Sequence, residues 1–268
     1  MTDKSNKLKA RLPRGLVAPD GGLGSVPAAP PATSAPLPTR EPLPTRDPAL
    51  APAGAEDQTW LVMMYQDADD KILEKDIYLD LNEAERVGSK DRVQIVAQID
   101  RYAGGYADDG DWTGTRRYYV TRDDDLNRVG SELIEELDEQ NMADGNTLVD
   151  FVTWAASTYP ADRMVLIMSD HGMGWPGGWS DPAPSTRESA NTPLASALGN
   201  QIYLDELDEA LQLARNQAGI EAFELIGMDA CLMAQLEVYS MLASHARYAV
   251  ASEETEPALG WAYAGFLS

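Results

Sequence analysis

Cysteine and histidine are scarce in this chain of 268 residues. A single cysteine excludes an internal disulfide bond and any metal site built from several thiolates. With only His171 and His245 present, a zinc site with three histidines is excluded as well. No apolar run is long enough to span a membrane. The sequence therefore predicts no thiolate or histidine metal centre and no membrane partner.

Basic residues are few beyond position 58. The chain has 21 Lys and Arg residues, of which 7 lie in 1–58. It has 44 Asp and Glu residues, of which 6 lie in 1–58. This leaves 14 basic and 38 acidic residues in 59–268, a net charge of −24. Such a segment repels the phosphates of nucleic acids and attracts cationic peptides or divalent ions, although the acidity can also serve only solubility. We expect no nucleic-acid partner.

The first 58 residues differ from the rest in composition. They contain 11 of the 17 prolines and repeat PLPTR at 36–40 and 42–46. Because such a stretch cannot bury enough apolar surface to offset its ordering entropy, we expect a disordered tail at 1–58 and one α/β domain at 59–268. The basic start lacks the apolar segment of a secretion signal, so that it predicts a cytoplasmic protein unless the start is misassigned.

Hydrophobic patterning predicts alternating strands and helices in the second region. Strands are expected at 59–66, 91–100, 163–172, 222–231 and 247–254, helices at 71–87, 130–141, 146–158, 203–217 and 232–245, and a small hairpin at 112–123. This alternation favours a mostly parallel sheet with helices on both faces. In such sheets ligands bind beyond the carboxyl ends of the strands.

The single cysteine, Cys231, ends one of the expected strands, and His171 ends another. An imidazole can take the proton of a thiol and return it to a leaving amine, provided that the two strands are neighbours. A helix beginning at residue 232 would also favour a negative sulfur. The alternative is a buried packing cysteine, since free cysteines are usually core. Against this, Asp229 shares a strand face with Cys231, and a buried face would not hold an unpaired carboxylate.

Several motifs occur in a specific order. They are LVMMYQDADDKILEKDIYLDLNEAERVGS (61–89), SDHG (169–172), YLDELDEAL (203–211), DAC (229–231) and ASEETEPALGWAY (251–263). Over nearly all of 59–263 the chain resembles the clostripain family of cysteine peptidases, in the caspase-like clan. The resemblance implies a caspase-like three-layer α/β sandwich and an endopeptidase that needs no cofactor for its chemistry. Clan members usually have a sixth strand, so that we expect a domain truncated after its fifth strand.

The resemblance also implies roles for individual residues. His171 would be the general base and acid, and Cys231 the nucleophile. The backbone N–H groups of Gly172 and Cys231 would form the oxyanion hole, because glycine lets a substrate carbonyl approach closely. No third, orienting residue is evident. Asp170 adjoins His171, but neighbours on a strand point to opposite faces.

An acid two residues before the nucleophile is the main candidate for substrate recognition. Asp229 would select an arginine or lysine before the scissile bond, as the family does, so that the expected partners are peptides or proteins with basic residues. The alternative is that Asp229 caps the helix expected after Cys231. Trp175 and Trp179 would wall the substrate groove or plug the sheet edge. Further pocket residues are expected after the fifth strand, namely Glu253, Glu254, Glu256 and Trp261.

Two further expectations concern activation and metal. Family members are often cut between the His and Cys segments, and the loop sequence PAPSTRESANTP places Arg187 there, which predicts cleavage after Arg187. Calcium, which some members need, is a candidate ligand of the acidic runs 66–70 and 121–127, although such runs are usually solvated surface. The rival function is a catalytically inactive, acidic binding module (a pseudopeptidase). A thiol transpeptidase or amidase is a third alternative.

Overall fold

The computed structural model describes residues 57–181 and 199–268. Its main sheet has seven strands in the order β4-β3-β2-β1-β5-β8-β9. Their bounds are β1 (Trp60–Ala68), β2 (Val93–Arg101), β3 (Gly114–Tyr119), β4 (Glu132–Glu136), β5 (Arg163–Ser169), β8 (Phe223–Asp229) and β9 (Ala246–Ala251). The five strands predicted from the sequence run parallel, and β3 and β4 extend one edge antiparallel. The short strands β6 (Gly177–Ser180) and β7 (Gln201–Tyr203) form a second sheet.

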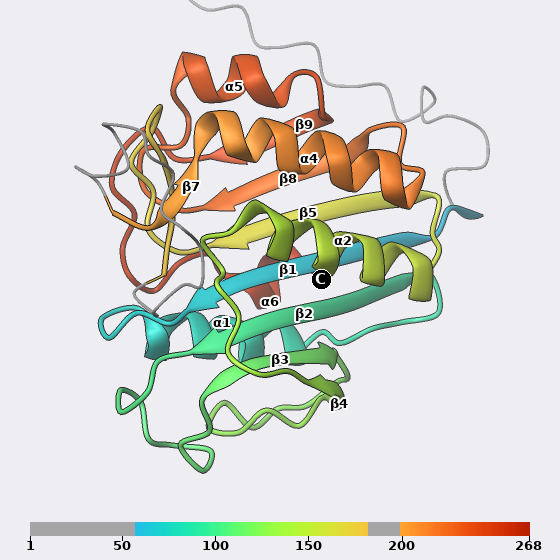
Figure 1. The fold of residues 1–268 in the computed structure, drawn as a ribbon. Coiled ribbons are helices and arrows are strands. Elements are labelled where there is room, and N and C mark those ends of the chain that lie inside the picture. Colours follow the sequence, from blue (N-terminus) through green and yellow to red (C-terminus); the bar gives the residue numbers. More distant parts are fainter. Residues whose placement is uncertain (1–56, 182–198) are drawn as a thin grey trace, which may run out of the picture. The chain divides into compact units, whose positions relative to one another are not determined.

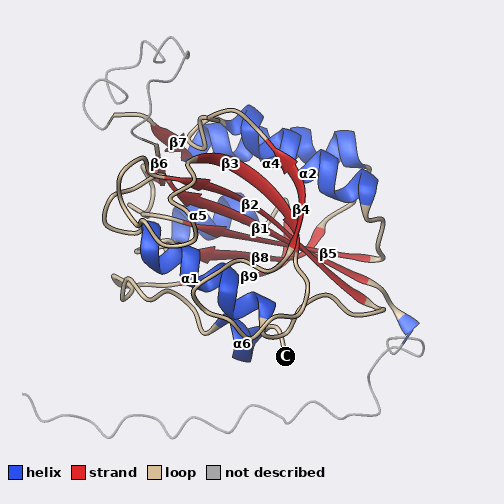
Figure 2. Cartoon of the chain, turned by 90° about the horizontal axis from the view of Figure 1, so that it is seen from below, coloured by secondary structure: helices blue, strands red, loops and turns tan. Residues whose placement is uncertain are grey.

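Helices cover both faces of the main sheet (Figure 1). One face carries α2 (Gly145–Thr158), α4 (Leu204–Ala218) and α5 (Leu236–Leu242). The other carries α1 (Glu74–Glu85) and the short α6 (Tyr263–Phe266). Figure 2 shows the strands between these two helical layers. The predicted class, a three-layer α/β fold with a mostly parallel sheet, is confirmed.

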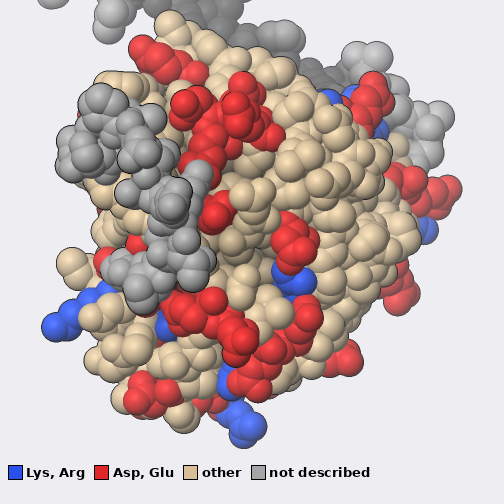
Figure 3. Space-filling view, in the orientation of Figure 1, with Lys and Arg blue, Asp and Glu red and all other residues tan. Residues whose placement is uncertain are grey.

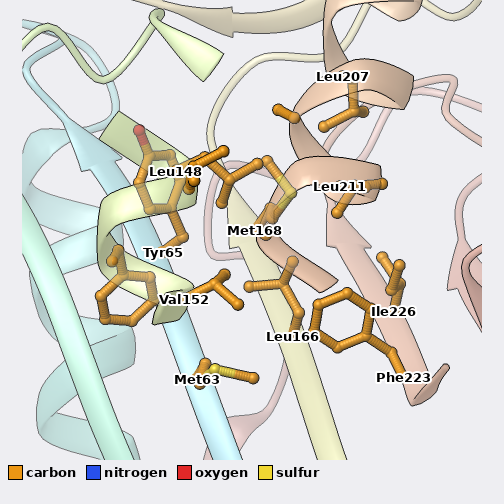
Figure 4. Close-up of a cluster of buried hydrophobic side chains, with 14 of the residues drawn as sticks. Met63, Tyr65, Leu148, Val152, Leu166, Met168, Leu207, Leu211, Phe223 and Ile226 are labelled. Atoms are coloured by element: carbon orange, nitrogen blue, oxygen red, sulfur yellow. The ribbon is translucent and has the colours of Figure 1, made fainter. Parts of the chain in front are cut away.

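The strands are apolar on both sides because both faces are covered. In β1, Leu61, Met63 and Tyr65 belong to the core under α2 and α4, whereas Val62 and Met64 belong to the core over α1. Figure 4 shows the first of these cores, where side chains of α2 and α4 meet those of β1, β5 and β8. The two cores pack against β5 and β8 from opposite faces, and the two strands pair with each other. The residues directly after these strands, including His171 and Cys231, therefore lie at the same edge of the sheet.

Sequence features near their ends and along their buried faces account for the two long helices α2 and α4. In α4, Leu207, Ala210, Leu211 and Ala214 are buried at helical spacing, and Gly219 ends the helix with φ 69°. The α2 helix begins at Asp144, whose side chain accepts the Asn146 N–H at 2.9 Å.

One predicted helix is wrong. Residues 130–141 contain β4 instead, which pairs with β3 through Tyr118↔Leu133 and Tyr119↔Glu132. The residues of β4 are mostly exposed, so that no buried face marks them as a strand. Cross-strand pairs such as Arg116 with Glu136, at 2.6 Å, accompany this pairing and override a helical propensity that is only a weak prior.

The expected charge asymmetry is visible at the surface. On the face shown in Figure 3, acidic side chains stand out and Lys and Arg are sparse. Among the described residues, no helix has the length and apolar character needed to cross a membrane. The predicted tail at 1–58 lies outside the described residues apart from its last two positions.

Candidate active site

The ends of β5 and β8 bring His171 and Cys231 to one place. Ser169 pairs with Asp229, and the Asp170 N–H donates to the Asp229 carbonyl oxygen at 3.4 Å. His171 and Cys231 each follow this rung by two residues, and both line a pocket with an empty volume of about 380 Å³. The imidazole side chain is 42% exposed, and Cys231 is partly exposed. The thiol is therefore not sealed in the core, and the imidazole shares its pocket.

Gly172 lies directly against the cysteine backbone. A Cβ atom at this position would overlap the carbonyl oxygen of Cys231 and lie 3.0 Å from the Cβ of Ala230. Gly172 also forms an isolated β-bridge with Gly178, at the start of the small β6–β7 sheet. The close approach of the β5 and β8 ends thus requires glycine here.

The Cys231 sulfur accepts a backbone hydrogen bond. The N–H of Glu256 donates to Sγ at 3.2 Å. An N–H donor at this distance stabilises negative charge on sulfur. The predicted helix from residue 232 is wrong at its start, because residues 231–235 form turns and α5 begins only at Leu236. The helix dipole does not act at the sulfur, and the loop after β9 supplies a donor instead.

Asp229 lies at the inner part of the pocket. It is 6% exposed, and its Oδ2 accepts the Tyr263 hydroxyl at 2.9 Å and the Trp261 N–H at 3.3 Å. Ser169 Oγ lies 3.0 Å from the same hydroxyl. Burial raises the pKa of the Asp229 carboxyl, and these donors oppose the rise. Its hydrogen-bond donors Tyr263 and Trp261 lie after β9 rather than in the first turn of α5, which is not the pattern of a helix cap.

Three more acidic residues, Asp80, Asp170 and Glu256, line the same pocket. Glu256 comes from the loop after β9; its pKa is raised to about 7 by burial and by the neighbouring charge of Asp229. Asp80 comes from α1 and is 3% exposed; burial and then Asp229 raise its pKa to about 10. Asp80 was not anticipated from sequence, because a helical Asp 151 positions before the cysteine carries no local signal.

His171 has an acidic neighbour that the sequence analysis also missed. Asp70 Oδ2 lies 3.5 Å from His171 Nε2. Its other oxygen, Oδ1, accepts the N–H groups of Ile72 and Leu73 at 2.7 and 2.8 Å. Asp170, by contrast, accepts the Ser180 N–H at 2.6 Å. The acid in contact with the imidazole thus comes from a loop after β1, which is adjacent to β5 in the sheet.

Three of the predicted site residues, Glu253, Trp175 and Trp179, lie outside the pocket lining. Glu253 is exposed. Trp175 is 55% exposed, and its N–H donates to Gln235 at 3.1 Å. Trp179 is fully buried in the core, with φ 55°. Of its two predicted positions, this resembles the one that covers the sheet edge rather than the one that lines a groove. Arg187 lies outside the described residues.

The described residues contain no group of three or more Asp, Glu, His or Cys side chains placed to hold a metal ion. In the two acidic runs, Asp70 accepts the N–H groups of Ile72 and Leu73 in the turn before α1, and Asp123 and Asp125 accept the N–H groups of Asp125 and Asn127 within their own loop. The contacts of these runs are those of turn residues. Calcium binding remains a prediction, and the chemistry below is derived from the side chains alone.

Comparisons with known proteins identify a family and related folds. The model of the clostripain family matches residues 64–268. Clostripain of Hathewaya histolytica is 28% identical over 200 residues, which cover 68% of this chain and 36% of that protein.

Among solved structures, a secreted C11 cysteine protease from Bacteroides thetaiotaomicron, in complex with an irreversible peptide inhibitor, is 26% identical with a TM-score of 0.58. An inactive zymogen C11 protease from Parabacteroides distasonis is 17% identical with a TM-score of 0.55, and shows likeness of fold. Each match covers 77% of this chain and 52% of the solved chain. This chain therefore spans about half the length of the two solved proteins, and 36% of the length of clostripain. The chain belongs to the clostripain family.

Proposed function

We propose that the protein is a cysteine endopeptidase that cuts peptide bonds after arginine or lysine. The observation that carries the proposal is the meeting of His171 and Cys231 at one sheet edge, beside a pocket lined by Asp229 and Glu256. Family membership supports the peptidase chemistry, and the irreversible peptide inhibitor bound to the related protease from Bacteroides thetaiotaomicron is consistent with it.

The reaction needs only groups of this chain and water. His171 takes the Cys231 proton as sulfur attacks the carbonyl carbon, and the oxyanion is held by the N–H groups of Gly172 and Cys231. The C–N bond then breaks, and the imidazolium gives its proton to the leaving amine. A water molecule, deprotonated by His171, attacks the thioester, and the proton returns to sulfur as the acid product leaves. Asp70 would hold the imidazole and stabilise its charged form.

The pocket supports basic specificity by charge. Asp229 and Glu256 place carboxyl groups beside the proposed nucleophile, and acidic side chains outnumber basic ones on the face shown in Figure 3. A guanidinium or ammonium group entering the pocket would form charge-assisted hydrogen bonds that a neutral side chain cannot form. Peptides and proteins with exposed basic residues are therefore the proposed substrates, and nucleic acids are not.

Processing and location belong to the same proposal. Arg187 is the proposed self-cleavage point, supported by its position between His171 and Cys231 and by the basic specificity. The zymogen form of the related Parabacteroides protease is consistent with activation by processing. The cytoplasmic location remains a prediction; the Bacteroides relative is described as secreted.

The deciding test is cleavage of fluorogenic peptides that differ only in the residue before the scissile bond. We expect turnover with Arg and Lys, none with Asp, and complete loss in Cys231→Ala or after iodoacetamide. A folded protein that binds basic peptides without cleaving them would instead favour the inactive binding module. Transfer of the acyl group to an added amine in preference to water would favour the transpeptidase.

A further inference from the structure

Asp80 is a carboxyl group of the pocket that none of the roles above uses. We propose that Asp80 determines specificity: together with Asp229 it binds a guanidinium from two sides, so that the pocket selects arginine over lysine. This inference rests on the proposed function, since it names the preferred member of the basic substrate class. The argument begins from where the two carboxyl groups lie.

Asp80 and Asp229 approach the same point from different elements. A Cβ atom built on Gly260 would lie 2.9 Å from Oδ2 of Asp80 and 2.9 Å from Oδ2 of Asp229. Because both oxygens are that close to one point, they are less than about 6 Å apart, a span that one guanidinium with donors on several edges can bridge. Gly260 lines the same pocket, and its φ of 58° belongs to a turn closed by its N–H to the Pro257 carbonyl, at 3.0 Å. Any larger residue there would fill the space between the two acids.

The two carboxyl groups differ in their partners. Asp229 is held by Tyr263 and Trp261, as described above. Asp80 lines the pocket at 3% exposure, and none of the described residues donates a hydrogen bond to its side chain. A buried carboxyl group without a donor is costly, and proteins retain such groups chiefly where something binds. The missing donor is what an arginine would bring.

The charges around Asp80 favour binding of a cation. Its pKa of about 10 reflects burial first, and then the charges of Asp229, Glu83 and Asp76. At neutral pH the empty pocket therefore holds Asp80 in its protonated form, next to Asp229. A guanidinium between them would reverse this balance, because an opposite charge in contact favours the ionised carboxylate. Binding of arginine should then release a proton to solvent.

Helix α1 fixes Asp80 in this position. At its start Glu74 pairs with Arg101 of β2 at 2.9 Å, and both side chains are essentially buried. Ile77 and Leu81, on either side of Asp80, pack in the core under the sheet. These contacts hold the α1 backbone at Asp80 against the sheet, and with it the position from which the Asp80 side chain enters the pocket. Lysine, a point charge that one carboxylate satisfies, gains less from such a fixed second acceptor.

The first experiment compares Asp80→Asn with wild type on matched fluorogenic peptides ending in Arg or Lys. We expect kcat/KM for Arg to fall by about 10- to 100-fold and that for Lys by less than about threefold. Asp91→Asn is the matched control: it removes an exposed acid that neither lines the pocket nor acts on Asp80, and it should leave the Arg-to-Lys ratio unchanged. Equal losses on both peptides would assign Asp80 a structural role and overturn the proposal.

The second experiment does not depend on turnover. An arginine peptide is titrated into Cys231→Ala at pH 7.5 in buffers of different ionisation enthalpy, with and without Asp80→Asn. Asp80→Asn should lower the affinity and release about one proton fewer per peptide. If wild type cleaves no peptide but this proton difference is found, the peptidase proposal fails and the role of Asp80 stands. If the peptide binds with equal proton release in both proteins, or does not bind at all, the role of Asp80 is refuted.

Discussion

Asp70 Oδ2 lies 3.5 Å from Nε2 of His171, while Asp70 Oδ1 accepts the N–H groups of Ile72 and Leu73. The carboxyl group thus joins the loop after β1 to the imidazole at the end of β5. This contact gives the proposed dyad an orienting acid that comes from 101 positions earlier in the sequence. Its effect can be isolated, because an asparagine can keep the two backbone contacts and lose only the charge.

We expect Asp70→Asn to lower kcat by about tenfold with little change in KM, since the imidazolium of the transition state loses its partner while substrate contacts persist. The melting temperature should stay close to that of wild type. Steady-state kinetics on an Arg peptide measure this, with the exposed Asp91→Asn as the control. A rise in KM with unchanged kcat would contradict the orienting role.

Gly172→Ala should abolish most activity. The added Cβ would overlap the Cys231 carbonyl oxygen, so that the β5 and β8 ends must separate and the oxyanion donors move. A loss of at least about 100-fold in kcat/KM is expected, in line with loss of an oxyanion donor. Gly265→Ala, where an added Cβ meets nothing within 4 Å, is the matched control. Near-normal activity in Gly172→Ala would exclude this packing.

Asp229→Asn tests the basic specificity. The amide oxygen can still accept from Tyr263 and Trp261, so that the fold should persist while the charge is lost. We expect kcat/KM for Arg and Lys peptides to fall by about 100-fold, with a smaller loss for a Leu peptide. Glu237→Gln, on the exposed side of α5, controls for the change in net charge. Equal losses on all three peptides would indicate a structural role for Asp229.

Stability should fall as pH rises from about 5 to 8. Asp100 is fully buried, and burial and then the charges of Glu139 and Asp181 raise its pKa to about 8. Between its unfolded value near 4 and about 8 the folded state alone keeps this proton, so that each pH unit lowers the free energy of unfolding by up to about 1.4 kcal/mol. Denaturant unfolding at pH 5 and 7 measures the loss, and Asp100→Asn should reduce it. Equal slopes in the two proteins would refute this assignment.

Self-processing predicts a specific change in mass. Intact-mass analysis of wild type should show two fragments that divide after Arg187, whereas Cys231→Ala should stay whole. Arg187→Gln should also remain uncut if this residue is the point of cleavage. Full activity in an uncut wild-type chain would refute activation by this route.

The sequence alone determined the five parallel strands and the positions of His171 and Cys231 at strand ends. These features follow from apolar runs that must be covered on both faces, and such runs are local properties of the chain. The sequence pattern gave a wrong prediction at β4, where a run rich in Glu and Leu is typical of a helix but pairs with β3 at an exposed edge. Edge pairing depends on a neighbouring strand and leaves little trace in hydrophobic periodicity.

The tertiary structure decided which acids surround the two reactive groups. Asp70 follows β1 and Asp80 lies on α1, and no sequence spacing links them to Cys231. Glu256 follows β9 and was expected only as one of several pocket candidates, from which the fold selects it. The three acids converge because the order β1-β5-β8-β9 aligns strand ends that are distant along the chain. The pKa values of Asp80 and Glu256 are also raised by burial and by the charge of Asp229, which act only after folding. The position of His171 and Cys231 at strand ends was thus readable from local pattern, whereas the acids around them required the packed fold.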